Sequence, residues 1–177
     1  METGVYFKLV DLRNRYGEQV LGQICQDLLA LSFVKIGCNP ASISVHNIEG
    51  VDIIFDDNNF GKYAIEVKTT SNDEITFGKK DYDGLRKYLH NDYKPILAVL
   101  KIGYFKDWVF IEGERLPRPC TLNVNGLYTS EEYKGLAEKI NKAFEELVLC
   151  YGREILNKGQ GFLNEKLKNE GIRYSGG

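Results

Sequence analysis

The stretch Gly50–Thr70, GVDIIFDDNNFGKYAIEVKTT, places two apolar, β-branched runs on either side of a polar turn. The turn contains Asp, Asn and Gly, which tolerate the backbone angles of a tight reversal. Runs of this composition around such a turn are typical of two strands that pair directly. The stretch therefore predicts an antiparallel β-hairpin.

Charged side chains interrupt both apolar runs of this hairpin. Side chains alternate between the two faces of a strand, so Glu66 and Lys68 share one face. Asp52 faces opposite to its apolar neighbours Val51 and Ile53. An unpaired charge in an apolar strand is costly. A divalent cation would compensate the carboxylates.

Apolar periodicity predicts further elements on both sides of the hairpin. Residues 15–34 and 131–151 repeat apolar side chains every three or four positions, which is typical of amphipathic helices. A shorter helical piece is expected over 163–168, whereas the type of the apolar stretch 5–10 stays open. Strands are expected near 43–45, 74–77, 95–100 and 108–111, and a basic helix over about 79–90. This order predicts a mixed α/β fold with helices on a central sheet.

Composition indicates an ordinary globular protein. The chain has 177 residues, of which 43% are hydrophobic, enough for one sizeable core. No apolar run approaches the roughly 20 residues needed to span a bilayer, and Met1–Gly4 lacks the features of a signal peptide. We expect no membrane association and a cytoplasmic location. The four cysteines lack CxxC spacing, so buried thiols are expected instead of a zinc site or disulfides.

The chain is expected to consist of a core domain over 1–118 and a C-terminal helical extension over 119–177. The apolar stripe of the helix predicted over 131–151 has two possible partners. It can pack on the core domain, or it can form the interface of a dimer.

Glu18 lies in the first turn of the helix predicted over 15–34 and has two interpretations. In the first, it is a half-exposed acid that interacts with the helix dipole. In the second, it is directed at the same cation as Asp52 and Glu66, because helical spacing aligns it with Leu21 and Cys25. Both interpretations stay open at this point.

The basic helix also has two interpretations. The formal net charge of −2 argues against general nucleic-acid binding but leaves room for a local basic surface. The bases of this helix form either a solvated face or a face that contacts phosphates. They are Lys79, Lys80, Arg86 and Lys87.

The order Glu18, Gly50-Val51-Asp52 and Glu66-Val67-Lys68 resembles the motif of the PD-(D/E)xK nuclease superfamily. The likeness covers about residues 14–111 and is greatest to archaeal Holliday junction resolvase-like nucleases. Val51 stands where the motif has proline. The resemblance implies a restriction endonuclease-like fold, in which a mixed β-sheet is flanked by helices.

The resemblance also implies a site and a chemistry. Glu18, Asp52, Glu66 and Lys68 correspond to the catalytic residues. Asp52, Glu66, the main-chain carbonyl of Val67 and Glu18 would hold Mg²⁺, with Mn²⁺ as a substitute. Lys68 would contact the scissile phosphate and assist the attacking water.

These expectations describe an Mg²⁺-dependent endonuclease that hydrolyses DNA phosphodiester bonds as a homodimer, acting on branched or otherwise structured DNA. A type II restriction endonuclease that cuts a specific duplex site is the alternative within this class. A non-cutting nucleic-acid-binding module and a purely structural charge cluster are alternatives of other classes. His46 and His90 lack the partners that a histidine-based nuclease or a Ser-His-Asp hydrolase needs.

Overall fold

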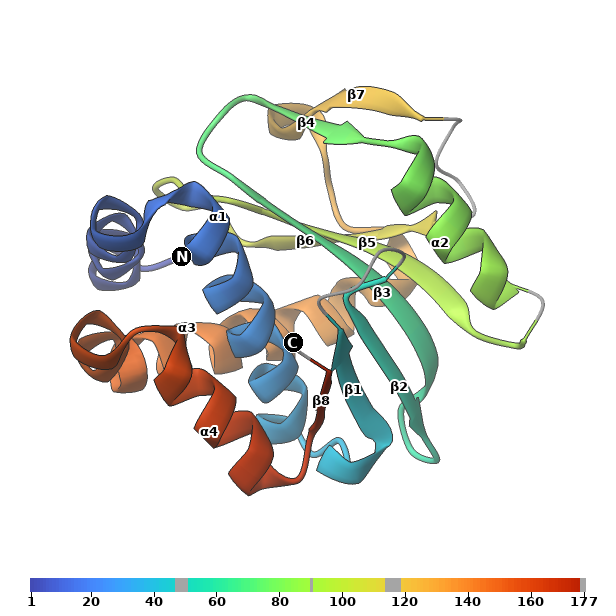
Figure 1. Cartoon of the computed structure of the whole chain (residues 1–177). Helices are drawn as coiled ribbons and strands as arrows, with labels where there is room; N and C mark the ends of the chain where they lie inside the picture. Colours follow the sequence, from blue (N-terminus) through green and yellow to red (C-terminus); the bar gives the residue numbers. More distant parts are fainter. Residues whose placement is uncertain (47–50, 90, 114–118, 176–177) are drawn as a thin grey trace.

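The computed structural model describes residues 1–46, 51–89, 91–113 and 119–175 (Figure 1). Gly50, His90 and the predicted domain boundary at residue 118 lie outside these ranges. In the described part, a six-stranded mixed sheet carries helices on both faces. The prediction of a mixed α/β fold with a helix-flanked mixed sheet is therefore confirmed.

The six-stranded sheet has the order β6-β5-β3-β2-β1-β8. The predicted hairpin is formed by β2 and β3, which pair antiparallel with Ile53 opposite Ile65. β3 pairs in parallel with β5, and β1 in parallel with β8. The strands are β1 (Ile43–His46), β2 (Ile53–Asp57), β3 (Gly61–Thr70), β5 (Lys94–Lys101), β6 (Trp108–Glu112) and β8 (Arg173–Ser175).

The two faces of the sheet are covered by different elements (Figure 1). One face, which includes Ile53, Ile65 and Ile96, packs against α1, α3 and α4 in the larger core. The other face, which includes Ala64 and Leu97, packs against α2 and a two-stranded sheet of β4 and β7. These covering elements are α1 (Thr3–Lys35), β4 (Glu74–Phe77), α2 (Lys79–Leu89), β7 (Cys120–Asn123), α3 (Lys134–Lys158) and α4 (Gln160–Glu170). Short 3₁₀ turns occur at η1 (Pro40–Ser42), η3 (Val124–Gly126) and η4 (Glu131–Tyr133).

α1 is longer than expected and is kinked at Gly17. It includes the stretch 5–10, whose type the sequence left open. Gly17 has φ 83° and ψ 169°, a left-handed conformation that residues with a Cβ rarely adopt. The helix therefore restarts at Glu18, and the two halves of α1 take different directions.

The C-terminal segment contributes to the same core as the rest of the chain. The apolar stripe of α3, including Ile140, Phe144 and Val148, is buried in the cluster that contains the α1 side chains. The segment also supplies β7 and β8, so it is not helical throughout. Cys25 and Cys38 are buried, whereas Cys150 is exposed on the outer side of α3, against expectation. Within the described ranges, no helix combines the length and apolarity required to cross a membrane.

Candidate active site

The register of the hairpin brings Asp52 and Glu66 together. Asp52 lies in a bend just before β2, and Glu66 follows Ile65, the residue of β3 that pairs with Ile53. The two carboxylates are close enough that the charge of Asp52 raises the pKa of Glu66. The N–H of Asp52 donates to the carbonyl of Ile65 at 2.9 Å, so the chain departs from the regular ladder at Asp52 while staying bonded to β3. Its carboxylate Oδ2 accepts a hydrogen bond of 2.7 Å from the N–H of Val67. This bond fixes the carboxylate beside the centre of β3.

Lys68 lies between two carboxylates on this face. Its Nζ is 2.8 Å from Glu66 Oε1 and 2.9 Å from Asp81 Oδ2. The side chain of Glu66 is 8% exposed and that of Lys68 is 25% exposed, so the pair is largely shielded from water. The structure thus gathers Asp52, Glu66 and Lys68 into one cluster, which Asp81 joins from α2.

Asp81 is the site residue that sequence reasoning missed. It occupies the first turn of α2, where its Oδ2 also accepts a hydrogen bond of 2.8 Å from the N–H of Gly78. An acid that reaches back to the main chain just before a helix is a known capping arrangement. The spacing from Gly78 to Asp81 therefore indicates a helix cap. It does not by itself indicate that the same carboxylate also contacts Lys68.

Electrostatics show that the negative charge in this cluster is incompletely compensated. Burial raises the pKa of Asp52 even though the Val67 N–H and Lys68 favour its ionised form. Burial and the proximity of Asp52 raise the pKa of Glu66. Burial works against the charge of Lys68, but the carboxylates of Glu66 and Asp81 outweigh it and raise the pKa of that ammonium group. One cation is thus shared among three carboxylates.

The donor set fits a hard divalent cation. Asp52 and Glu66 supply carboxylate oxygens, which Mg²⁺ prefers, and their raised pKa values mark charge that another cation would stabilise. Among the described residues, no three Asp, Glu, His or Cys side chains form a metal-binding group by themselves. An ion here would therefore be held by two carboxylates, a main-chain carbonyl such as that of Val67, and water, because Mg²⁺ retains several waters in proteins.

Glu18 is not part of this cluster. Its side chain is 56% exposed, and its charged neighbour is Arg13, at 4.0 Å from Glu18 Oε1. The buried side chains of α1, including Cys25, belong to the core on the face of the sheet opposite to Glu66, the face that carries Ile65. Glu18 thus has the surroundings of a half-exposed acid at the start of a helical segment.

The bases of α2 lie on its exposed side. Lys79 forms an ion pair with Asp83, and the guanidinium of Arg86 lies 5.4 Å from the centre of the Tyr82 ring. Lys80 and Lys87 are exposed. The helix therefore presents positive charge to solvent from the same element that supplies Asp81.

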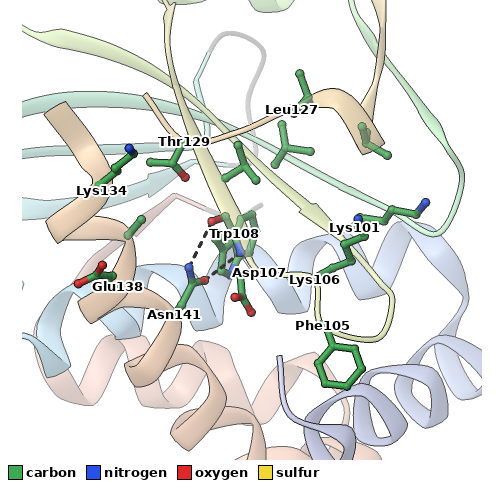
Figure 2. Close-up of a pocket in the computed structure, with 14 residues that line it drawn as sticks. Lys101, Phe105, Lys106, Asp107, Trp108, Leu127, Thr129, Lys134, Glu138 and Asn141 are labelled. Carbon is green, nitrogen blue, oxygen red and sulfur yellow. Dashed lines mark hydrogen bonds between the residues drawn. The ribbon is translucent and has the colours of Figure 1, made fainter. Parts of the chain in front are cut away.

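A cavity of about 570 Å³ lies apart from this cluster, beside the edge strand β6 (Figure 2). Asn141 closes its α3 side by accepting a hydrogen bond from the N–H of Trp108 and donating one to its carbonyl. Its lining includes Lys101, Phe105 and Lys134 but none of the four clustered residues. The cluster is the stronger candidate site, because buried charged side chains converge there and not in the lining of this cavity.

Comparison with known proteins gives a likeness to solved structures alone. No protein-family profile matches the sequence, and no curated protein matches it either. Among solved structures, the chain is similar to Hjc, a Holliday junction resolvase from Archaeoglobus fulgidus. The two share 15% sequence identity with a TM-score of 0.39, over 52% of this chain and 79% of the resolvase.

Proposed function

We propose that this protein is a metal-dependent nuclease that hydrolyses phosphodiester bonds in DNA. The observation that carries the proposal is the convergence of Asp52, Glu66 and Lys68 on one face of the hairpin. Two carboxylates that bind a hard cation beside a lysine that binds phosphate are the groups that this hydrolysis requires. The incomplete compensation of their charge supports the same conclusion.

Each residue has a distinct role in this proposal. Asp52, Glu66 and the carbonyl of Val67 would hold Mg²⁺ or Mn²⁺, which would stabilise the negative charge that develops on the phosphate oxygens. The bond from the Val67 N–H orients the carboxylate of Asp52. Lys68 would donate to the scissile phosphate and orient water for attack, after leaving one of its two carboxylate partners. The bases of α2, including Lys80 and Lys87, would contact the DNA backbone.

The competing interpretation is that these charges only stabilise the fold, and one observation favours it. Lys68 is already paired with both Glu66 and Asp81, so the network stabilises itself in part without any substrate. A nucleic-acid-binding module that does not cut is compatible with the same pairs. Cleavage assays separate these alternatives from a nuclease.

The test is cleavage of a four-way DNA junction and of a supercoiled plasmid, each with Mg²⁺ or with EDTA. We expect cutting with Mg²⁺ only. Preference for the junction indicates a resolvase-like enzyme, whereas discrete plasmid fragments indicate a restriction-type enzyme. Sedimentation of the active form tests the predicted homodimer, which would supply two sites for two strand cuts.

The same hairpin provides matched control variants. Asp52→Asn and Lys68→Ala should abolish cleavage. Asp56 and Lys62 form an ion pair of 3.3 Å at the turn end of the same two strands. Asp56→Asn and Lys62→Ala should therefore leave cleavage unchanged. Cleavage that survives both Asp52→Asn and Lys68→Ala would show that the proposal is wrong.

A further inference from the structure

A cluster of aromatic side chains lies on the surface where the N-terminal half of α1 meets the turn between β5 and β6. The ring centres of Tyr6 and Tyr104 are 4.1 Å apart, and Phe7 contacts both rings at 5.5 and 6.1 Å. Phe105 follows Tyr104 in the turn. These rings remain accessible, with exposed fractions of 52% for Phe7, 50% for Tyr104 and 85% for Phe105. We call Tyr6, Phe7, Tyr104 and Phe105 the aromatic cluster.

The aromatic cluster lies just beyond the end of the sheet where β3 and β5 finish, the end nearer to Lys68. The first half of α1 follows the C-terminal ends of β3 and β5, because Arg13 donates to Ser71 Oγ at 2.9 Å and Tyr6 contacts Tyr104. Lys68 pairs with Val99 across β3 and β5. Five residues from Val99 to Tyr104 span at most about 17 Å. That distance corresponds to about five nucleotide steps of 3.4 Å, so one bound nucleic acid can reach both places.

Phe105 contributes little to folding. It occupies the third position of the turn Gly103–Lys106, which is closed by a hydrogen bond of 3.4 Å between the ends of that turn. Its φ is 55°, a conformation that favours Gly or Asn and is unfavourable for a bulky side chain. Figure 2 shows its ring directed away from Trp108 and Asn141. An exposed aromatic ring is thus combined with a strained backbone at this position.

The size of the aromatic cluster argues against a second copy of the chain as its partner. The exposed parts of its rings amount to about 400 Å², given 150–250 Å² per aromatic side chain. A stable dimer buries about 800 Å² on each partner. Arg13 lies about two helical turns along α1 from Tyr6, and exposed aromatic rings near a basic side chain are instead suited to unpaired bases and their phosphates.

We propose that the aromatic cluster and Arg13 bind a single-stranded segment of the nucleic acid substrate, a proposal that rests on the nuclease function proposed above. Bases of the unpaired strand stack on Phe7, Tyr104 and Phe105, and the guanidinium of Arg13 contacts a phosphate between them and Lys68. The substrate class is therefore a duplex with an unpaired tail or flap beside the cut, not a uniform duplex.

The test compares two DNA ligands by fluorescence anisotropy in EDTA, which prevents cutting. One is a blunt duplex, and the other is the same duplex with a ten-nucleotide single-stranded tail. We expect the wild type to bind the tailed duplex more tightly. The double variant Phe7→Ala, Phe105→Gly should weaken binding of the tailed duplex about tenfold or more and change binding of the blunt duplex less than about twofold.

Two controls keep this test informative. Tyr128 is 82% exposed and lies outside the aromatic cluster, so Tyr128→Ala should change neither affinity. Phe105→Gly relieves an unfavourable φ, so its thermal midpoint should equal or exceed that of the wild type. A loss of binding together with an intact fold then reports the rings themselves.

Three outcomes overturn the inference. The first is that the wild type binds both ligands with equal affinity. The second is that the double variant binds the tailed duplex as tightly as the wild type does. The third is that the wild type is a dimer and the double variant is a monomer that still prefers the tailed duplex. The last would identify a self-association surface. Failure of the proposed function is seen separately, because it removes Mg²⁺-dependent cleavage of any DNA whether or not tails bind.

Discussion

An aspartate lies at each end of β2: Asp52 just before the strand and Asp57 at its last residue. Their surroundings shift the two pKa values in opposite directions. Asp57, which is 5% exposed, accepts hydrogen bonds from the N–H groups of Asn39 at 2.8 Å, Asn59 at 2.8 Å and Phe60 at 3.1 Å. These bonds, that of Asn39 above all, lower its pKa. At the other end, the carboxylate of Asp52 accepts one main-chain bond, and burial raises its pKa.

This difference separates a carboxylate whose charge is satisfied within the chain from one that the proposed function assigns to a reaction. The negative charge of Asp57 is satisfied within the chain, so its bonds fix the turn and the segment before β1. The charge of Asp52 is held beside two further carboxylates with one lysine to share. A site in which negative charge exceeds positive charge favours the binding of a cation, as the proposed function requires.

The largest expected effect is on activity, at Asp52. Asp52→Asn should reduce Mg²⁺-dependent cleavage by about 1,000-fold or more, equivalent to about 4 kcal/mol. The amide oxygen can still accept the bond from the Val67 N–H, so the free energy of unfolding should change by less than about 1 kcal/mol. Single-turnover cleavage and urea denaturation measure the two quantities. A variant that unfolds in proportion to its lost activity would contradict the assignment of Asp52 to the reaction.

The next effect is on stability, at Asp57. Asp57→Ala removes the acceptor of several main-chain donors and should lower the free energy of unfolding by about 3 kcal/mol at pH 7. Because the pKa of Asp57 is lowered on folding, the ionised form stabilises the protein above its unfolded pKa, and this contribution is lost as the pH falls through the folded pKa. The difference between variant and wild type should therefore shrink below about pH 4. Denaturation at pH 7 and pH 3.5 tests this, and cleavage by the variant should persist at low temperature.

Local patterns explain why the hairpin could be predicted from the sequence. Alternating apolar residues and an Asp/Asn/Gly turn act over neighbouring positions, and the observed pairing of Ile53 with Ile65 follows from them. Glu66 and Lys68 then share a face by alternation alone, whereas Asp52 lies in a bend before β2 and is held by its bond to the Val67 N–H. The strand at Glu74–Phe77 and the helix at Lys79–Leu89 were predictable for the same reason.

The parts of the site that the sequence did not predict depend on contacts between distant elements. Asp81 contacts Lys68 only because α2 packs over β3, and no local sequence pattern indicates that packing. Helical spacing aligned Glu18 with buried side chains, but Gly17 restarts the helix there and leaves Glu18 exposed. The aromatic cluster joins residues about 100 positions apart and had no signal in either segment.

Asp27 is a third shielded carboxylate, and it accepts a weaker set of hydrogen bonds than Asp57 does. It is 1% exposed on α1, and its hydrogen bond from Gln160 Nε2 is long, at 3.4 Å. Burial raises its pKa to about 7, so ionisation of Asp27 costs folded stability increasingly as the pH rises from its unfolded pKa to that value. Asp27→Asn should therefore stabilise the protein by up to about 4 kcal/mol at pH 8 and have almost no effect near pH 4. Thermal midpoints at these two pH values check the sign, which is opposite to that for Asp57.

The smallest expected effect is the stabilisation of the wild type by Mg²⁺. An ion that binds the folded chain but not the unfolded chain at ten times its dissociation constant adds about 1.4 kcal/mol. For a chain of this size, that corresponds to a rise of about 3–5 °C in the thermal midpoint. Asp52→Asn and Glu66→Gln should each remove the rise in thermal midpoint. Each replaces one of the carboxylates whose negative charge Lys68 alone does not balance. Asp56→Asn, on the same strand but paired with Lys62, should keep it. An equal rise in all of these variants would mean that Mg²⁺ binds elsewhere, and the contrast between the two ends of β2 would then describe folding alone.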